Sequence, residues 1–416
     1  MGETGRGAAV AAALVTAEGP LPLRGAAAAA ANLTHAGLAW DDEGTIVFVG
    51  PAEDLPWPAR VGSPDIGCLT PGFVDCHVHL PFFGWRADEF EARAKGVSYR
   101  DLHGEEGGIF RSSRMLAEAS DNDVLAFCEP LLAEMAAHGT TALELKTGYG
   151  LSVEGELRQA RLARLLAGRV PQTCRVTLLA CHAVPKDVNR SDWVRQACDE
   201  LIPEAARQGL ADAVDVYVED IAFSIDDLAR VGDAANAAGL PLRVHADQLG
   251  GSGAAEASVA LGARSADHLN HVSEQGVRAL GAADATAAVL LPASTFMLRA
   301  QPSPVASLIE AGAAVAIATD FNPGTSPVLS MPEALAMACT VYAMEPLAAL
   351  AAATANAAWV LGLGETHGTL EVGKRADFVL LEEPAFAQVP YRPGHNPVVA
   401  TFVGGRQVAG RGRTSP

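Results

Sequence analysis

The sequence has few positive charges for its size and lacks the patterns of several large protein classes. Its 30 lysine and arginine residues stand against 49 aspartate and glutamate residues, for a formal net charge of −19. A protein that binds nucleic acid needs a basic surface, so DNA and RNA are not expected partners. No apolar run reaches the length of a membrane span, and no G-x-G-x-x-G motif follows an expected strand. We therefore expect no nucleic-acid partner, no membrane association and no doubly wound dinucleotide-binding domain.

The cysteine content argues against a disulfide framework. The seven cysteines are scattered, their number is odd, and none form a C-x-x-C pair. Reduced thiols of this kind are typical of the cytoplasm, which is where we expect the protein. A chain of 416 residues that is 49% hydrophobic is long enough for one large domain and a smaller one.

The two ends of the chain have a similar sequence pattern. Both contain short apolar runs that are closed by glycine or proline, such as Thr45–Val49 near the start and Val399–Val408 near the end. Such runs indicate short strands joined by turns. We expect residues 1–70 and 366–416 to form one composite β-sandwich domain, with the middle of the chain inserted into it.

The middle of the chain, residues 71–365, alternates apolar strands with helical stretches, which indicates a parallel α/β arrangement. Eight strands with helical crossovers are the number required for a (β/α)8 TIM barrel. The expected strands are Phe73–His79, Thr140–Lys146, Val176–Cys181, Ala213–Val218, Leu240–His245, Arg264–His268, Ala287–Leu291 and Ala314–Thr319.

Several side chains that can bind a metal lie at the expected strand ends, where TIM barrels have their active sites. His77 and His79 end the first strand, and alternate residues of a strand face the same side, so their imidazoles can converge. Imidazole and carboxylate ligands suit zinc, and also iron or manganese. A ligand set of His77, His79, His245 and Asp320 would leave an open position for water.

The chain resembles the imidazolonepropionases of the amidohydrolase superfamily between about residue 40 and residue 408. The opening motif Pro71–His79 and the run Gly373–Asp377 are similar to motifs of the superfamily. The stretches that are similar to imidazolonepropionases are Arg86–Phe90, Gly107–Ile109, Lys146–Gly150, His182–Pro185, His245–Gln248, Ser265–Leu269 and Ala318–Ser326.

The resemblance implies a site and a reaction. His77, His79, His245 and Asp320 would bind one zinc or iron ion per subunit, and His268 beside it would hold the oxyanion or the attacking water. Substrate contacts would come from Arg86, which grips the propionate, and from Tyr149, His182, Gln248, Asn322, Gly324 and Thr325. Asp320 would also carry the proton during hydrolysis of 4-imidazolone-5-propanoate to N-formimidoyl-L-glutamate, a step of histidine degradation. The superfamily resemblance also favours a homodimer.

Three positions depart from the family pattern. Gln248 stands where relatives often have a proton-carrying glutamate, so proton transfer would fall to Asp320 and His268, and the amide would bind substrate. Trp85 and Cys181 replace smaller residues, and we expect both to crowd the pocket. We expect Lys146 to hold the Tyr149 loop or a nearby carboxylate rather than to bridge two metal ions.

Two alternatives stay open on the sequence. The first is an enzyme of the same fold that deaminates or hydrolyses another small nitrogen heterocycle, against which Gln248 and Arg86 argue. The second is a binding or scaffold protein that has lost its metal, against which the complete ligand set argues.

Overall fold

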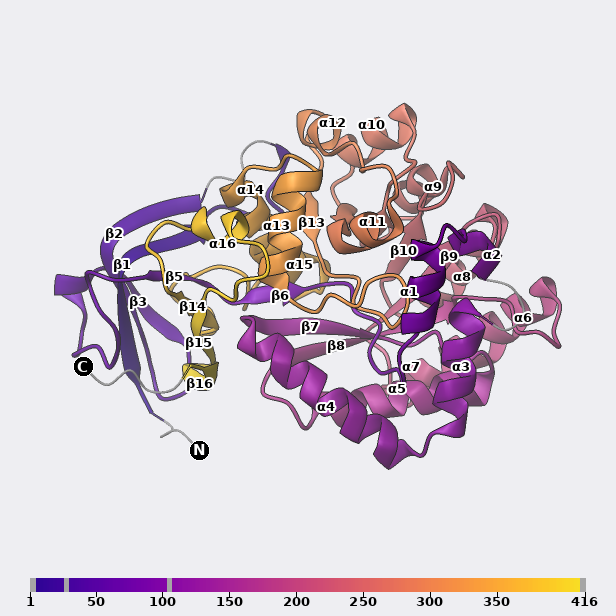
Figure 1. Ribbon diagram of the computed structural model, residues 1–416, viewed down its shortest axis with the longest axis horizontal. Coiled ribbons are helices and arrows are strands. Elements are labelled where there is room, and N and C mark those ends of the chain that lie inside the picture. Colours follow the sequence, from indigo (N-terminus) through magenta and orange to yellow (C-terminus); the bar gives the residue numbers. More distant parts are fainter. Residues whose placement is uncertain (1–4, 26–29, 103–106, 412–416) are drawn as a thin grey trace.

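The computed structural model describes residues 5–25, 30–102 and 107–411, which form two parts (Figure 1). Strands from both ends of the chain build one sheet, and the middle of the chain builds a barrel beside it. This agrees with the predicted fold class. The exact domain limits at 70/71 and 365/366 stay predictions.

The composite sheet has eight strands, seven of them in the order β16-β15-β14-β5-β1-β2-β3, with β4 paired to β1. The sheet curls on itself, because Trp40 of β2 lies 5.4 Å from Phe378 of β14, three strands away, by ring centroids. The side chains between the facing strands are therefore enclosed, as expected for the predicted β-sandwich. The strands are β1 (Gly7–Ala17), β2 (Ala30–Trp40), β3 (Ile46–Pro51), β4 (Val61–Gly62), β5 (Cys68–Pro71), β14 (Phe378–Leu381), β15 (Val398–Val403) and β16 (Arg406–Gly410).

The barrel consists of eight parallel strands that pair in chain order from β6 to β13. Its ends approach each other where Val78 bridges Phe321 and the amide of His79 donates to the Phe321 carbonyl at 2.9 Å. The strands are β6 (Phe73–Asp75), β7 (Thr140–Lys146), β8 (Thr173–Cys181), β9 (Ala213–Val218), β10 (Leu242–Ala246), β11 (Ser265–His268), β12 (Ala287–Leu290) and β13 (Val315–Ile317).

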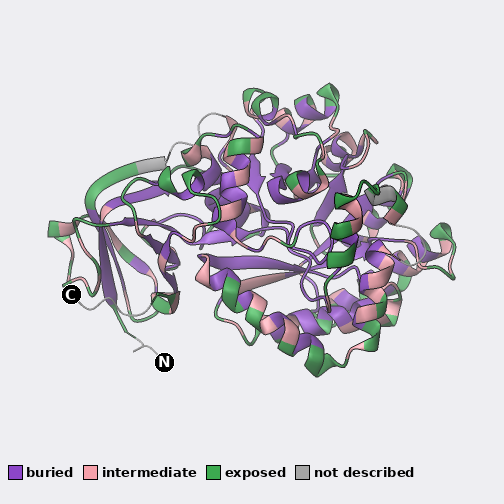
Figure 2. Ribbon diagram, viewed as in Figure 1, coloured by how far each residue is buried: buried purple, intermediate pink, exposed green. Residues whose placement is uncertain are grey.

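Helices cover the outside of the barrel, with buried strands inside and exposed outer helix faces (Figure 2). Serine begins several of them: Ser120, Ser152 and Ser224 each accept a hydrogen bond from the amide three residues on. The helices are α1 (Ala87–Ala94), α2 (Tyr99–Leu102), α3 (Gly108–Glu118), α4 (Asp121–Ala137), α5 (Val153–Ala167), α6 (Arg190–Gln196), α7 (Ile202–Arg207), α8 (Ile225–Ala237), α9 (Ala254–Ala260), α10 (Glu274–Ala282), α11 (Pro292–Leu298), α12 (Val305–Glu310), α13 (Met331–Val341), α14 (Pro346–Ala351), α15 (Ala357–Val360) and α16 (Gln388–Tyr391). No helix in the described ranges has the length and apolar character needed to cross a membrane.

The first barrel strand is shorter than predicted. β6 ends at Asp75, so His77 and His79 lie beyond its regular pairing with β7 rather than inside the strand. The chain stays extended there because Val78 bridges Phe321 and its carbonyl accepts from the Lys146 amide at 2.9 Å. These contacts with β7 and with the segment after β13 keep both imidazoles on the inner side.

Candidate metal centre and active site

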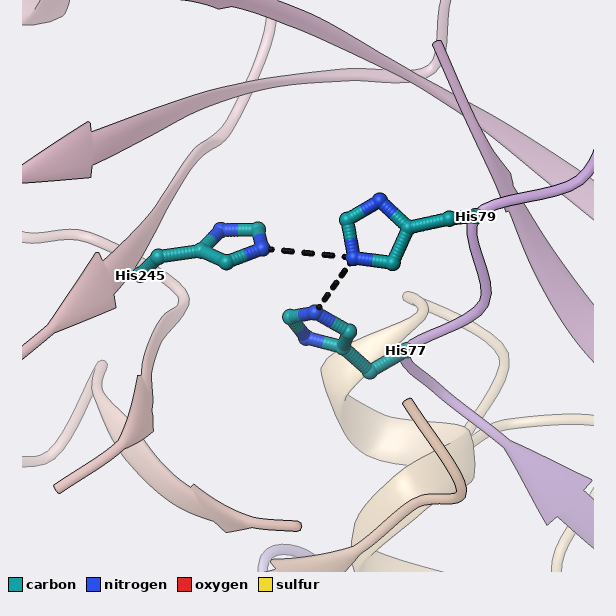
Figure 3. Close-up of side chains that lie close together, drawn as sticks. All are labelled: His77, His79 and His245. Carbon is teal, nitrogen blue, oxygen red and sulfur yellow. Dashed lines mark hydrogen bonds between the residues drawn. The ribbon is translucent and has the colours of Figure 1, made fainter. Parts of the chain in front are cut away.

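Four potential metal ligands meet at the C-terminal end of the barrel. The Nε2 atom of His79 lies 3.2 Å from Nε2 of His77 and 3.4 Å from Nε2 of His245 (Figure 3). Asp320 Oδ1 is 3.2 Å from Nε2 of His79 and 3.6 Å from Nε2 of His77. All four side chains are buried. The structure therefore brings together the full ligand set that was predicted.

The spacing of these four atoms fits a tetrahedral ion. Ligands about 2.0–2.2 Å from zinc at the corners of a tetrahedron lie about 3.3–3.6 Å from one another. The four separations given above, 3.2–3.6 Å, are close to this range. Burial, and the nearby Lys146 charge, hold the pKa of His77 well below its usual value, so its imidazole is in the neutral form that binds metals.

Two buried carboxylates hold the ligand histidines from behind. Asp267 Oδ2 accepts from Nδ1 of His77 at 2.6 Å, and Asp215 Oδ1 accepts from Nδ1 of His245 at 3.1 Å. A proton on Nδ1 leaves Nε2 with its lone pair free for an ion, so each carboxylate selects the metal-binding tautomer.

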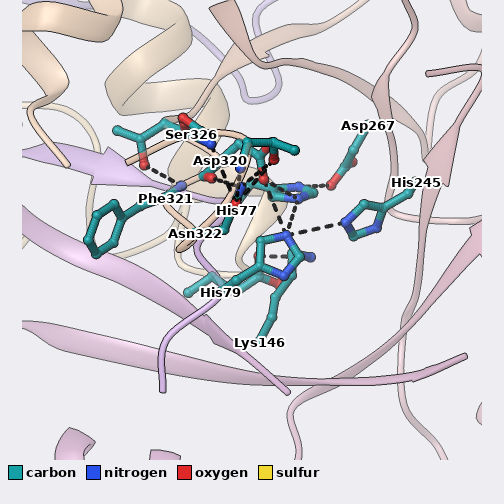
Figure 4. A network of polar contacts seen from close by, with 12 residues as sticks. His77, His79, Lys146, His245, Asp267, Asp320, Phe321, Asn322 and Ser326 are labelled. Carbon is teal, nitrogen blue, oxygen red and sulfur yellow. Dashed lines mark hydrogen bonds and ion pairs between the residues drawn. The ribbon is translucent and has the colours of Figure 1, made fainter. Parts of the chain in front are cut away.

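Two buried cations, one of them the Lys146 labelled in Figure 4, hold those carboxylates in turn. Lys146 Nζ lies 2.5 Å from Asp215 Oδ2 and 2.9 Å from Glu144 Oε2. Arg243 Nη2 lies 3.1 Å from Asp267 Oδ2. Lys146 thus contacts nearby carboxylates, which is one of the two roles predicted for it.

Asp320 is held in a strained conformation. Its φ is +54°, a left-handed value that costs a residue with a Cβ roughly 1–2 kcal/mol. Buried neighbours maintain it, because Asp75 accepts from both the amide and the hydroxyl of Thr319, at 3.0 and 2.6 Å, and Asn322 Nδ2 donates to the Asp320 carbonyl at 2.6 Å. This backbone conformation places the Asp320 carboxylate next to His77 and His79.

A pocket opens above this cluster. Its lining includes His79, Arg86, Ile109, Tyr149, His182, Tyr217, His245, Gln248, His268, Asp320, Asn322 and Thr325. All of the predicted site residues lie there except His77, which is beneath the pocket, and Gly324.

Arg86 brings a positive charge to the pocket, and part of its guanidinium group makes no hydrogen bond within the described residues. Its Nε and Nη1 atoms are buried without a hydrogen-bond partner among the described residues, and Glu89 Oε2 is 3.7 Å from Nε. Gly324 leaves room for this side chain, since a Cβ there would lie 1.5 Å from Nη2 of Arg86. A buried guanidinium with unused donors fits an incoming carboxylate.

The comparisons with known proteins agree with this geometry. Residues 68–408 match the amidohydrolase family. The imidazolonepropionase of Serratia proteamaculans (strain 568) is 43% identical over 354 residues, which cover 84% of this chain and 86% of that protein. The imidazolonepropionase of Pseudomonas aeruginosa PAO1 is 43% identical over 347 residues, which cover 82% of this chain and 86% of that protein. The chain belongs to the amidohydrolase family, among the imidazolonepropionases. It is therefore a hydrolytic enzyme of a metal-dependent family.

Solved structures support the fold. A zinc-bound adenosine deaminase from Xanthomonas campestris aligns with a TM-score of 0.72 at 20% identity, over 97% of this chain and 92% of that one. E. coli guanine deaminase aligns with a TM-score of 0.73 at 17% identity, over 98% of this chain and 100% of that one. At these identities the likeness concerns the fold alone.

The loops that carry the remaining pocket residues of this amidohydrolase are held by buried side chains. Glu156 accepts from the amides of Gly148 and Leu151 at 2.9 and 3.0 Å, and His182 Nδ1 lies 2.9 Å from the Gly148 carbonyl oxygen. Glu219 Oε1 accepts from the amide of Gln248 at 2.6 Å, which gives Glu219 a structural role.

The prediction that Trp85 and Cys181 crowd the pocket is wrong. Trp85 packs its ring against Phe82, Phe127 and Phe321 and is not among the lining residues. Cys181 points into the hydrophobic core outside the pocket. Neither side chain crowds the pocket, because Cys181 is buried in the core and Trp85 lies at the surface against the three phenylalanine rings.

Three residues of the site were missed by sequence reasoning. Ile109 and Tyr217 line the pocket, and Asp215 holds His245. Asp215 and Tyr217 alternate along β9, so the period of two in an apolar strand was a signal that could have found them.

Proposed function

We propose that this enzyme hydrolyses the cyclic amide of 4-imidazolone-5-propanoate to N-formimidoyl-L-glutamate, the reaction of histidine degradation after which its relatives are named. The observation that carries the substrate is the buried Arg86, which lines the pocket above the four-ligand cluster and has two nitrogens without a hydrogen-bond partner among the described residues. A neutral ring alone would not need a buried cation there, whereas a propionate would pair with it.

We infer one metal ion per subunit, zinc or iron, held by His77, His79, His245 and Asp320. The neutral imidazole of His77 and the close spacing of the four ligand atoms support this set. When bound, such an ion lowers the pKa of water and polarises a carbonyl group.

Asp320 is the proposed proton carrier. Burial raises the pKa of its carboxyl, but the hydrogen bond from His79 and the neighbouring His268 outweigh this, so the pKa lies below its ordinary value. An ionised carboxylate can accept a proton on Oδ2 as the water oxygen bonds to the ring carbonyl carbon. The carbon–nitrogen bond then breaks as that proton passes to the ring nitrogen.

His268 and Gln248 are proposed to bind the reacting group rather than to titrate. Burial lowers the pKa of His268 to about 3, so the imidazole is neutral near pH 7 and can donate one N–H to a developing oxyanion. Gln248 lines the pocket with an amide that can only hydrogen-bond. The proposed substrate contacts of Tyr149, His182, Asn322 and Thr325 are supported by their place in the lining.

The proposal is tested by following ring opening of freshly prepared 4-imidazolone-5-propanoate by absorbance, with adenosine and guanine as comparison substrates. We expect turnover of the imidazolone alone. Arg86→Ala should raise KM by about 100-fold, as expected for the loss of a charge-assisted bidentate contact. The exposed Arg207→Ala is the matched control. Absence of ring opening by the metal-loaded protein, or an unchanged KM in Arg86→Ala, would refute the assignment.

Elemental analysis of the purified enzyme decides between zinc and iron. The expected homodimer and the expected cytoplasmic location stay predictions, which sedimentation and cell fractionation can check.

A further inference from the structure

A second cavity, of about 410 Å³, lies at the N-terminal end of the barrel. It is lined by residues near the starts of β8 to β11 and by the turn after α15. The candidate active site is at the opposite ends of the same strands, so the two cavities are separate. The charged residues of this second cavity are Arg175, Arg243, Arg264 and Asp212.

The arginines of this cavity are incompletely neutralised. Within the described part of the chain, neither the Arg175 nor the Arg264 guanidinium has an ion-pair partner, and that of Arg264 stacks 4.2 Å from the Trp359 ring centroid. Asp212 is already engaged, because its Oδ2 lies 2.9 Å from Arg164 Nη1 and accepts from the Val176 amide at 2.8 Å. A cavity with excess positive charge is unusual for a protein of net charge −19.

The positive charges also repel one another. Burial and the charge of Arg243 lower the pKa of Arg264, so its cationic form is disfavoured by its surroundings. Arg243 itself is fully buried and keeps its two guanidinium nitrogens on Glu144 and Asp267. A bound anion would relieve this repulsion, and planar guanidinium groups match oxyanions in shape.

We propose that this cavity binds a small anion with two negative charges, either a phosphate or a dicarboxylate. Arg175 and Arg264 would supply the paired contacts, and Trp359 would keep the Arg264 guanidinium in place. Its volume lies in the range of small-molecule sites.

This proposal does not depend on the proposed reaction, because none of the lining residues belongs to the catalytic pocket. Arg243 is unsuitable as a test, since it also holds Asp267 behind the ligand His77. The informative variants are therefore Arg175→Gln and Arg264→Gln.

The test is calorimetric titration of the metal-loaded protein with sodium phosphate and with sodium succinate, against sodium chloride at equal ionic strength. We expect one saturable site per chain for phosphate or for succinate, and the anion that binds identifies the ligand class. Affinity should fall at least tenfold in Arg175→Gln and in Arg264→Gln. It should be unchanged in the exposed Arg207→Gln, and any binding that is lost in Arg86→Ala is assigned to the catalytic pocket instead.

Thermal unfolding of each variant checks that it is folded, and a variant that fails is replaced by the Arg→Lys substitution at the same position. Binding no stronger than that of chloride overturns the proposal. So does saturable binding that persists in the double variant Arg175→Gln/Arg264→Gln, because that anion would then be held elsewhere.

Discussion

The two ends of the barrel carry opposite kinds of site. The C-terminal end gathers His77, His79, His245 and Asp320, with Nε2 of His79 3.2–3.4 Å from a ligand atom of each of the other three, which suits a cation. The N-terminal end gathers arginines around a cavity, which suits an anion. Inward side chains of a parallel strand recur every two residues, so one strand can serve both ends.

β10 illustrates this division. Arg243 and His245 are two residues apart and both face the barrel interior, one toward each end. Between the two sites lies a buried charged layer of Glu144, Lys146, Asp215, Arg243 and Asp267. TIM-barrel interiors are usually filled by branched apolar residues, so this layer needs a reason beyond packing. It holds His77 and His245 in one tautomer.

The largest effect is expected at the metal end, from Asp320→Asn. The amide has no proton-accepting oxygen of comparable basicity, so kcat should fall at least about 1,000-fold while metal content is largely retained. Steady-state kinetics and elemental analysis of the same preparation check this. An unchanged kcat would remove Asp320 from the proton pathway.

The charged layer between the ends is tested by Lys146→Met. Removing the ammonium leaves buried Asp215 without its lysine partner and Glu144 with Arg243 alone, which should lower the free energy of unfolding by about 3–5 kcal/mol. Urea denaturation measures the loss, and competition with a chelator should show weaker metal binding because His245 is no longer held.

The matched control for this change is Lys95→Met. Lys95 Nζ also lies 2.5 Å from a carboxylate oxygen, that of Glu91, but both side chains are exposed. We expect little change in its urea midpoint. Equal losses in the two variants would show that burial of the layer is irrelevant.

A smaller effect is expected for Gly324→Ala at the metal end. The new methyl group would overlap Nη2 of Arg86, so KM should rise about 10–100-fold with a smaller change in kcat. Gly250→Ala is the control, because a Cβ there meets no atom within 4 Å. If KM is the same in Gly324→Ala and wild type, Arg86 does not hold the substrate in the position seen here.

The smallest effect concerns acid stability at the arginine end. Burial, together with the charges of Arg375 and Arg175, lowers the pKa of His367 to about 4. Between pH 6.5 and 4 the unfolded chain binds this proton and the folded chain does not, so stability falls as the pH falls.

From pH 6.5 to 5, wild type should lose about 2 kcal/mol more unfolding free energy than His367→Gln. Urea denaturation at both pH values measures this, with the exposed His35→Gln as control. Parallel losses in wild type and His367→Gln would show that the His367 pKa is not depressed in the folded protein.

The sequence by itself determined the barrel and the composite terminal sheet, and it singled out the three histidines and the aspartate that meet at the C-terminal end of the barrel. Period-two apolar strands and polar residues at their ends are local patterns, which is why sequence alone sufficed. Arg86 and His268 were found through motif resemblance, and the structure places both in the pocket.

Only the tertiary structure decided what each side chain faces. β6 ends at Asp75 because the following residues pair across the barrel closure with the Phe321 segment, a contact between positions over 200 residues apart. Cys181 turns into the hydrophobic core, and Trp85 lies against three phenylalanine rings. Asp215 on β9 meets His245 on the neighbouring β10, whereas Asp267 on β11 meets His77, which follows β6 on another part of the barrel. Such pairings depend on how eight strands close into a barrel, which sets strand neighbours and register that no local pattern contains.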